Sequence, residues 1–410
     1  MYKLLFENKL KELKELGQYR EFVSVNRMKG AYPFASIGPI DSKNKAVVWC
    51  SNDYLGMSQN PKVLEAMHTA IEQFGAGSGG SRNIGGTHYL YQLLEASLAD
   101  WHHKDKSLVF PTGYSANDAS LQCLLRLIPD CVVFSDALNH ASIINGLRSC
   151  RVERHVFNHN DVKHLESLLA SKPLNQPKLV VFESVYSMDG DIAPIEQIVT
   201  LAKKYNALTF LDEVHAIGMY GHRGAGMAEQ KGVSSEVDII QATLAKGVGV
   251  IGGYIASSEV IIDTIRSFAS GFIFTTSLPP VIVAACYTSL EHIKQSNKER
   301  VVLHEKTGIL RKKLSQAGIP VMKQSQTHIL PILIGDGIKC KKAAKRLLEK
   351  HQIYLQPINS PTVPMGTERF RVNVTPNHSE FQINQLVYSL SEVFDYYEIK
   401  HIKNKDYAVI

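Results

Sequence analysis

Apolar and polar positions follow two alternating patterns along most of the chain. Short apolar runs rich in β-branched and aromatic residues are separated by longer segments in which apolar residues recur every three or four positions. The first pattern predicts buried strands and the second predicts amphipathic helices. From about residue 47 to 257 the two alternate regularly, which indicates an α/β fold with a mostly parallel sheet flanked by helices on both faces.

The predicted strands of this region are the apolar runs at 107–110, 131–134, 178–183, 207–212, 238–243 and 252–257. The predicted helices lie near 61–74, 116–127, 142–148, 194–205 and 281–295. The helix at 61–74 has the clearest ends, because Pro61 suits a first helical position and Gly75 suits the position after the last turn.

A different pattern begins near residue 290. Apolar runs at 328–334, 353–358 and 368–374 predict strands, and helical patterns lie near 338–350 and 379–394. We therefore expect three segments: an N-terminal helix and arm at 1–45, a large α/β domain at 46–290, and a smaller C-terminal α+β domain at 291–410.

Composition excludes several classes of protein. Hydrophobic residues make up 44% and charged residues 20% of the 410 positions, so most of the chain is expected to fold around a core. The net charge of +6 is small, and no basic stripe interleaved with aromatic residues indicates nucleic-acid binding. No run of 18 apolar residues predicts a membrane helix, and the first 22 residues lack the features of a signal or transit peptide. We expect a cytoplasmic protein.

The six cysteines are scattered without a C-x-x-C pair, which predicts reduced thiols and no zinc site. The glycine-rich segment GAGSGGSRNIGG at 75–86 contains a G-x-G-x-x-G spacing. A dinucleotide site needs that spacing to follow a strand, whereas here it follows a predicted helix. The remaining interpretations are a flexible turn or a backbone that a ligand can approach closely.

The strongest local signal is the segment ALTFLDEVHAIG, in which a predicted strand ends at Asp212 and His215 follows. Lys246 comes just after the next predicted strand and is the only charged residue between Asp238 and Glu259. An apolar setting lowers the pKa of a lysine and activates it for imine formation with an aldehyde. A buried aspartate can hold a pyridinium nitrogen protonated. A helix cap or part of a metal site are weaker interpretations of Asp212.

The segment FPTGYSAND at 110–118 combines a strand end, a turn and a helix start, which suits phosphate binding by backbone N–H groups. Thr243, Thr275 and Thr276 add hydroxyl groups. His140 could stack on a flat ring, although a lone histidine is more often structural. Arg371, on a predicted strand, could bind a carboxylate.

Several segments together resemble the α-oxoamine synthases, the pyridoxal 5′-phosphate (PLP) enzymes of fold type I that condense an amino acid with an acyl-CoA. They span nearly the whole chain in order, and include VWCSNDYLGMSQNPKV, GAGSGGSRNIGGT, SDALNHASII, FESVYSMDGDIAPI, LDEVHAIGMYG, TLAKGVGVIGGYIA, GFIFTTSLPP and QPINSPTVPMGTERFRV. The resemblance implies the PLP-dependent transferase fold type I and is strongest to members that join glycine to succinyl-CoA with release of coenzyme A and CO2.

The resemblance also implies roles for individual residues. The catalytic group would be Lys246 as the Schiff-base lysine, Asp212 at the pyridine nitrogen, His215 at the phenolic oxygen and His140 stacked on the ring. Ser187 would lie beside the cofactor, and Gly113, Tyr114 and Thr243 would bind the phosphate. Thr275 and Thr276 would do so from the partner subunit of a homodimer with shared active sites. The substrate positions would be Arg371 for the amino-acid carboxylate, Arg20 for the distal succinyl carboxylate, and Asn52, Ser81, Asn83 and Ile84 around the acyl group.

Four positions depart from the family pattern. Ser81 stands where threonine is usual, Gly247-Val248 replaces an alanine–aromatic pair, Tyr91 replaces a common histidine, and Met365 a common arginine. The first two bear on acyl preference. The alternatives are therefore an α-oxoamine synthase with another acyl-CoA or amino acid, such as a 2-amino-3-ketobutyrate CoA ligase, and a non-catalytic PLP-fold binding protein. A dinucleotide oxidoreductase is weaker still.

Overall fold

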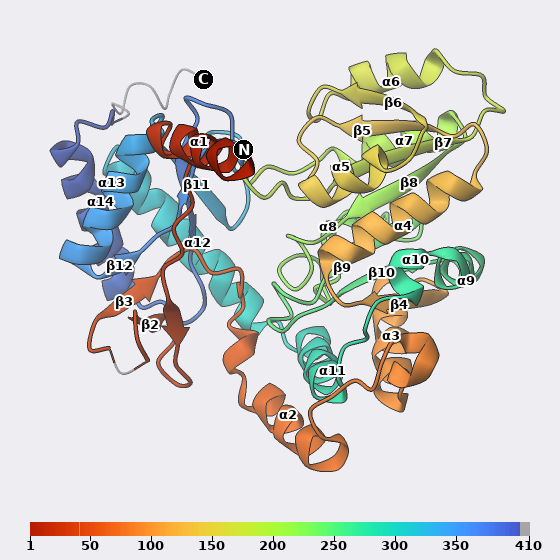
Figure 1. Cartoon of the computed structure of the whole chain (residues 1–410), viewed down its shortest axis with the longest axis horizontal. Helices are drawn as coiled ribbons and strands as arrows, with labels where there is room; N and C mark the ends of the chain where they lie inside the picture. Colours follow the sequence, from red (N-terminus) through yellow and green to blue (C-terminus); the bar gives the residue numbers. More distant parts are fainter. Residues whose placement is uncertain (41, 402–410) are drawn as a thin grey trace. The chain divides into compact units, whose positions relative to one another are not determined.

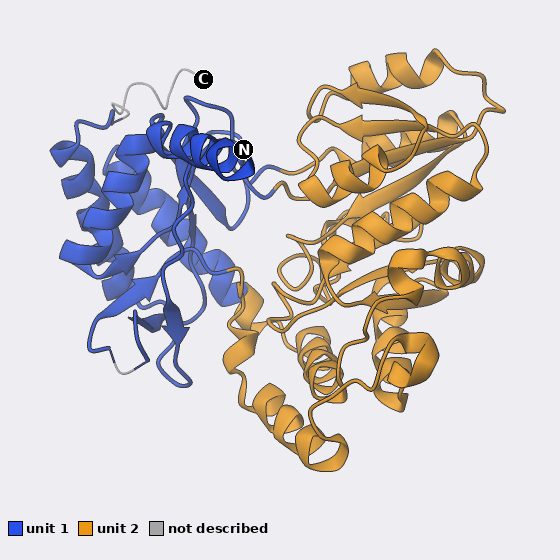
Figure 2. Cartoon of the chain, in the orientation of Figure 1, with its two compact units in different colours: residues 1–51, 187–191, 301–410 blue, residues 52–186, 192–300 orange. Residues whose placement is uncertain are grey.

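The computed structural model describes residues 1–40 and 42–401, and divides them into two compact units (Figures 1 and 2). Of the described residues, unit 1 comprises 1–40, 42–51, 187–191 and 301–401, and unit 2 comprises 52–186 and 192–300. The first 51 residues thus group with the C-terminal part. The three-segment division at residues 45 and 290 stays a prediction about the chain's organisation.

Unit 2 is built on a seven-stranded sheet in the order β4-β10-β9-β8-β7-β5-β6. The sheet is parallel except for β10, which runs antiparallel to both of its neighbours. The strands are β4 (Lys106–Phe110), β5 (Val132–Asp136), β6 (Glu153–Phe157), β7 (Lys178–Glu183), β8 (Ala207–Asp212), β9 (Ile239–Thr243) and β10 (Gly253–Ser257). The predicted mostly parallel α/β sheet is confirmed.

Helices flank this sheet, and α4, α7 and α9 pack directly on it (Figure 1). The helices of unit 2 are α2 (Pro61–Phe74), α3 (Tyr89–His102), α4 (Gly113–Leu127), α5 (Ala141–Arg148), α6 (Val162–Ala170), α7 (Ile195–Lys204), α8 (Met227–Gln230), α9 (Glu259–Phe268), α10 (Ser270–Ile273) and α11 (Pro280–Gln295), with short η1 (Met57–Gln59) and η2 (Arg82–Gly86). The predicted ends of the helix at 61–74 are confirmed, with Pro61 in the first turn and Gly75 as the C-cap.

The central strands are buried on both faces. All residues of β5, β7, β9 and β10 are buried, because helices cover both sides of the sheet. One core cluster joins side chains of six strands to α4, α5 and α9, and includes Phe110, Val181, Phe210 and Ile255. The rigid sheet fixes where each strand ends, and therefore where the residues that follow β8 and β9 lie.

Unit 1 contains two smaller sheets. The order β1-β2-β3-β12 joins the N-terminal strands to a C-terminal strand, and β11-β14-β13 forms the second sheet. The strands are β1 (Val25–Arg27), β2 (Phe34–Ile37), β3 (Lys45–Val48), β11 (Ile329–Leu333), β12 (Ile353–Tyr354), β13 (Pro357–Ile358) and β14 (Arg369–Asn373); the helices are α1 (Tyr2–Glu15), α12 (Lys298–Gln316), α13 (Gly337–His351) and α14 (Glu380–Tyr396).

One predicted strand is wrong in extent. The run 353–358 forms two short strands in different sheets, because β12 pairs with β3 and β13 pairs with β14. The parallel pairing of Ile353 with Val47 also explains why the N-terminal segment groups with the C-terminal part. The apolar pattern does not show this break, because Leu355 is apolar and lies between the two strands.

Candidate active site

Asp212 and Lys246 follow two neighbouring parallel strands. Asp212 ends β8 and pairs in register with Gln241 of β9, and Lys246 comes three residues after the end of β9. Asp212 is buried, whereas Lys246 is half-buried. The ammonium group of Lys246 is close enough to Asp212, His140 and Glu183 to act on the pKa of all three. The carboxylate and the lysine predicted from the sequence therefore lie near each other at the carboxyl ends of β8 and β9.

The environment of Asp212 suits an ionised carboxylate facing a cation. Burial raises its pKa, and the opposing influences are hydrogen bonds from Asn117 Nδ2 and the Val214 N–H, each 2.8 Å long, and the nearby His140 and Lys246. A buried negative charge is costly unless donors or a cation compensate for it. A protonated ring nitrogen would supply such a cation.

His140 belongs to the same hydrogen-bonded group. Its Nδ1 accepts from the Ser142 N–H at 3.2 Å and lies 2.8 Å from Ser142 Oγ. Asn117 Nδ2 donates to both Ser142 Oγ, at 3.1 Å, and Asp212. Burial lowers the pKa of His140, Asp212 raises it, and Lys246 lowers it further. The imidazole is therefore held in one orientation, with Nδ1 as the acceptor of the Ser142 N–H.

His215 is buried beside Tyr54. The Tyr54 hydroxyl lies 2.8 Å from His215 Nδ1, and it donates to Asn52 Oδ1 at 3.3 Å. Tyr54 is fully buried. The sequence predicted roles for His215 and Asn52 but gave no sign of the tyrosine between them, because Tyr54 lies in an irregular segment with no strand end beside it.

The predicted phosphate site is the N-terminus of α4. Thr112 caps the helix by accepting from the Ser115 N–H, and Gly113 and Tyr114 occupy the first two helical positions, whose N–H groups have no acceptor within a helix. A Cβ atom at Gly113 would lie 3.0 Å from Thr243 Cβ, so the helix start packs tightly against Thr243. Two N–H groups and a helix dipole form a set that fits a phosphate. Thr243 packs against them, and its hydroxyl donates to the Gly252 carbonyl at 2.8 Å.

The glycine-rich segment pairs with the segment that holds the two predicted partner threonines. Ser81 and Thr276 form an isolated β-bridge, and Ser277 donates from its N–H to the Gly80 carbonyl at 3.0 Å. Ile84 is 81% exposed and Phe274 is 83% exposed. The residues predicted to surround the acyl group, Ser81, Asn83 and Ile84, therefore lie on the same strip of surface as Thr276.

Tyr91, one of the departures from the family pattern, is buried and contacts both Arg82 of the glycine-rich segment and Leu278. Its hydroxyl accepts from the Leu278 N–H at 2.7 Å, and the guanidinium of Arg82 lies 3.7 Å from the centre of its ring. Arg82 also forms two hydrogen bonds with the carboxylate of Glu95, at 2.8 and 3.1 Å. The replacement of histidine by tyrosine thus serves the packing of the glycine-rich segment.

Two predicted residues meet within unit 1. Arg371, on β14, is 6% exposed and donates from Nε to the Ser187 carbonyl at 2.6 Å. Its neighbour Arg369 pairs with Asp189 at 3.1 Å. Two arginines of β14 therefore bind residues 187–191, one through a hydrogen bond and the other through an ion pair. Arg20 lies in the irregular segment after α1, with an exposed side chain.

Besides Tyr54, the sequence analysis missed three residues of the site: Asn117, Ser142 and Glu183. Glu183 ends β7 as Asp212 ends β8, so the same strand-end signal was present in the run KLVVFE. Asn117 and Ser142 lie one turn into α4 and at the start of α5, where polar residues carry no distinguishing pattern. Only the packing of α4 against α5 and β9 shows that Asn117 reaches Asp212 and that Ser142 reaches Asn117.

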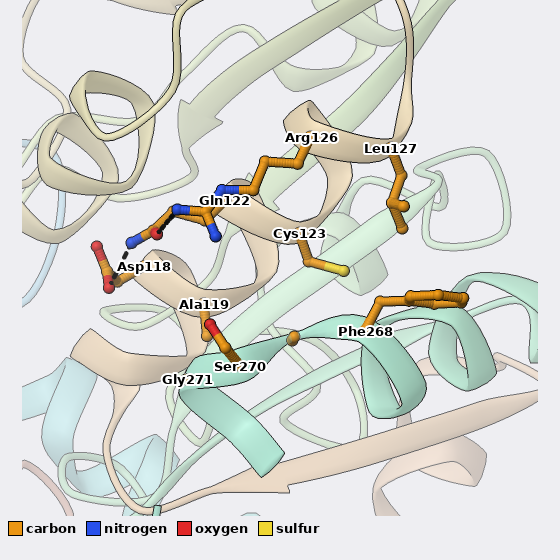
Figure 3. A pocket seen from close by; sticks show the side chains of 10 residues that line it. Asp118, Ala119, Gln122, Cys123, Arg126, Leu127, Phe268, Ser270 and Gly271 are labelled. Atoms are coloured by element: carbon orange, nitrogen blue, oxygen red, sulfur yellow. Dashed lines mark hydrogen bonds between the residues drawn. The ribbon is translucent and has the colours of Figure 1, made fainter. Parts of the chain in front are cut away.

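A hollow of about 420 Å³ at the later turns of α4 is unrelated to this site (Figure 3). It opens between α4 and the junction of α9 with α10, and its lining residues are Asp118, Ala119, Gln122, Cys123, Arg126, Leu127, Phe268, Ala269, Ser270 and Gly271. None of the residues predicted for the active site lines it.

In the part of the chain that the structure describes, no helix has the length and apolar character needed to cross a membrane.

Comparison with known proteins places these residues in a family. The sequence profile of the family "Aminotransferase class I and II" matches residues 44–390. The 5-aminolevulinate synthase of Rickettsia bellii is 50% identical over 393 residues, which cover 96% of this chain and 94% of that protein. That of Bradyrhizobium diazoefficiens is 48% identical over 394 residues, covering 96% of each. Serine palmitoyltransferase of S. paucimobilis, solved with PLP and myriocin bound, is 29% identical with a TM-score of 0.88, covering 96% of this chain and 97% of that one.

Proposed function

Because this chain belongs to the aminotransferase class I and II family, we propose that it acts as its 5-aminolevulinate synthase relatives are named, condensing glycine with succinyl-CoA to give 5-aminolevulinate, coenzyme A and CO2. The cofactor is PLP. The observation that carries the proposal is the buried Asp212 beside Lys246 at the ends of two neighbouring strands, in a chain about half identical to those synthases over nearly its full length.

The residues present fit PLP. A helix N-terminus with Thr243 against it suits the phosphate. A buried carboxylate that accepts hydrogen bonds from Asn117 Nδ2 and the Val214 N–H suits a protonated pyridine nitrogen. When bound, PLP supplies an aldehyde that bonds covalently to amines and a ring that accepts electron density from the carbon next to the amine. His140 would lie on that ring, and His215 would donate to its phenolic oxygen.

Lys246 is the base of the reaction. Its amine would hold the cofactor until glycine arrives, and would then take a proton from the glycine α-carbon and return one to the product. Asp212 would hold the ring nitrogen protonated, because its own negative charge is stabilised by Asn117 and the Val214 N–H. Arg371 binds the glycine carboxylate, and a planar guanidinium suits that task. After the carbon–carbon bond forms, coenzyme A leaves, followed by CO2 from the glycine carboxylate.

The succinyl side of the site is assigned to Arg20, Asn52, Ser81, Asn83 and Ile84. Arg20 supplies the charge for the distal carboxylate of a short dicarboxylic acyl group. Exposure of Ile84 and Phe274 on one strip supports a homodimer in which this strip, with Thr275 and Thr276, completes the site of the partner subunit. A cytoplasmic location also stays a prediction.

A product assay tests the proposal. The purified protein, loaded with PLP, is given glycine and each of acetyl-, butyryl-, succinyl- and pimeloyl-CoA, and the amino ketone and CO2 are measured. We expect 5-aminolevulinate and CO2 from succinyl-CoA with a kcat/KM at least about tenfold above that for butyryl-CoA, the value of one charge-assisted contact. Equal use of all four substrates would reject the succinyl assignment.

A further inference from the structure

Two carboxylates lie next to each other at the ends of β7 and β8. Strands β7 and β8 lie side by side in the sheet (Figure 1). Glu183 and Asp212 are paired in register across them, so their side chains emerge on the same side of the sheet. Each is only 3% exposed. Two negative charges this close to each other and shielded from water would repel strongly, so the pair favours one ionised and one neutral carboxyl group.

The surroundings decide which of the two is ionised. Asp212 accepts from Asn117 Nδ2 and from the Val214 N–H, and His140 and Lys246 lie close to it. Glu183 accepts from one backbone N–H. Burial raises the pKa of Glu183 well above its ordinary range, the charges of Asp212 and Asp136 raise it further, and Lys246 and the N–H donor lower it. The negative charge therefore resides on Asp212.

Glu183 is in contact with the segment that carries His140. Its Oε1 accepts from the His140 N–H at 2.6 Å. The preceding residue, Asn139, donates from Nδ2 to the Val181 carbonyl of the same strand at 2.8 Å. Two hydrogen bonds therefore join residues 139 and 140 to β7 just before α5 begins. The imidazole itself is hydrogen-bonded to Ser142 through Nδ1. Backbone and side chain of His140 have separate anchors.

We propose that Glu183 is a positioning residue that acts as an uncharged hydrogen-bond acceptor for the His140 backbone and so fixes the plane of the imidazole. This inference rests on the proposed function, which places that imidazole on the PLP ring. It assigns a role to a residue outside the set predicted from the sequence. Glu183→Gln preserves the acceptor without a charge, and Glu183→Leu removes the acceptor at similar volume.

The first measurement uses the protein without added PLP. Amide hydrogen exchange at residue 140 reports directly on the bond to Glu183. We expect protection in Glu183→Gln within about threefold of the unsubstituted protein and a loss of at least about tenfold in Glu183→Leu, because the N–H loses its acceptor. Equal protection in Glu183→Leu and the unsubstituted protein would overturn the proposal.

The second measurement uses the PLP-loaded dimer. We expect Glu183→Leu to shift the absorbance band of the bound cofactor, to weaken PLP binding about tenfold, as for one lost ring contact, and to lower kcat with little change in the KM for glycine. Glu183→Gln should restore all three and give the same kcat–pH profile between pH 6 and 9 as the unsubstituted protein.

If Glu183→Leu does not fold, the kcat–pH profile of Glu183→Gln tests the proposal by itself. A profile that overlays that of the unsubstituted protein supports a neutral acceptor. The loss of an ionisation, or a fall in kcat as large as that expected for Glu183→Leu, would show that the charge of Glu183 is needed and would overturn the proposal. The two proposals fail separately: an unsubstituted protein that binds no PLP rejects the proposed function, whereas one that turns over normally beside a defective Glu183→Gln rejects only this inference.

Discussion

The cofactor side and the acyl side of the proposed site differ in how much of each one chain provides. Around Asp212, buried side chains from α4, α5, β7 and β8 hold one another through short hydrogen bonds. Around Ser81, Asn83 and Ile84, side chains are half-buried or exposed and the segment is held mainly through its backbone. The difference indicates that the groups around Asp212 are fixed by contacts within one chain, whereas the segment around Ser81 leaves much of its surface exposed.

The largest effect is expected at the centre of the buried side. Lys246→Ala should lower kcat by at least about 10³-fold, because the residue moves a proton in the transition state. Product formation from glycine and succinyl-CoA is the measurement, with Lys204→Ala, an exposed lysine of α7, as the matched control. Turnover by Lys246→Ala within tenfold of the control would reject the assignment.

The next effect is expected at Asp212. Asp212→Ala should lower kcat by about 10²-fold, because the ring nitrogen loses the charge that keeps it protonated. Absorbance and retained cofactor show whether PLP is still bound, so that loss of chemistry is separated from loss of binding. If the variant binds PLP and keeps full activity, Asp212 does not face the ring nitrogen.

Arg20 tests the exposed side. Arg20→Leu should lower kcat/KM for succinyl-CoA by about 10- to 100-fold and leave that for butyryl-CoA within about threefold, because only the first substrate loses an ion pair. The ratio of the two values is the measurement, and Arg20→Lys is the conservative control. Equal losses for both substrates would mean that Arg20 stabilises the arm without binding the carboxylate.

The smallest effect is expected at Ser81. Ser81→Thr restores the residue that is usual in the family and adds one methyl group while the hydroxyl remains. Because Ser81 is only half-buried in one chain, we expect kcat/KM for succinyl-CoA to change by less than about threefold. A change above tenfold in the succinyl-to-butyryl ratio would show that this position is tightly enclosed in the assembled protein.

The sequence was more informative for the buried side than for the exposed one. Strand ends such as those at Asp212 and Thr243 can be read from apolar runs, and neighbouring strands bring them together. Asn117 could not be found this way, because its role depends on how α4 packs on the sheet. The helices α3 and α12 were not predicted either: α3 is apolar on several sides, and in α12 charged residues obscure the apolar positions.

Roles on the acyl side rested on the resemblance alone. The glycine-rich segment gave no periodic signal, and its pairing with 276–277 is a long-range contact that local pattern cannot show. The hydrogen bond from Arg371 to the Ser187 carbonyl is also a contact that local pattern cannot show, because it joins residues 184 positions apart in the chain. Local sequence predicts where strands end, and only the folded chain shows which distant side chains meet there.

The most direct test of the account is the chemical identity of the lysine that carries the cofactor. The PLP-loaded protein is reduced with borohydride and digested, and the peptides are weighed by mass spectrometry. The account predicts one pyridoxyl phosphate adduct, on the peptide containing Lys246 and fragmenting at that residue. An adduct on another lysine, or none on Lys246 in a protein that makes 5-aminolevulinate, would contradict it.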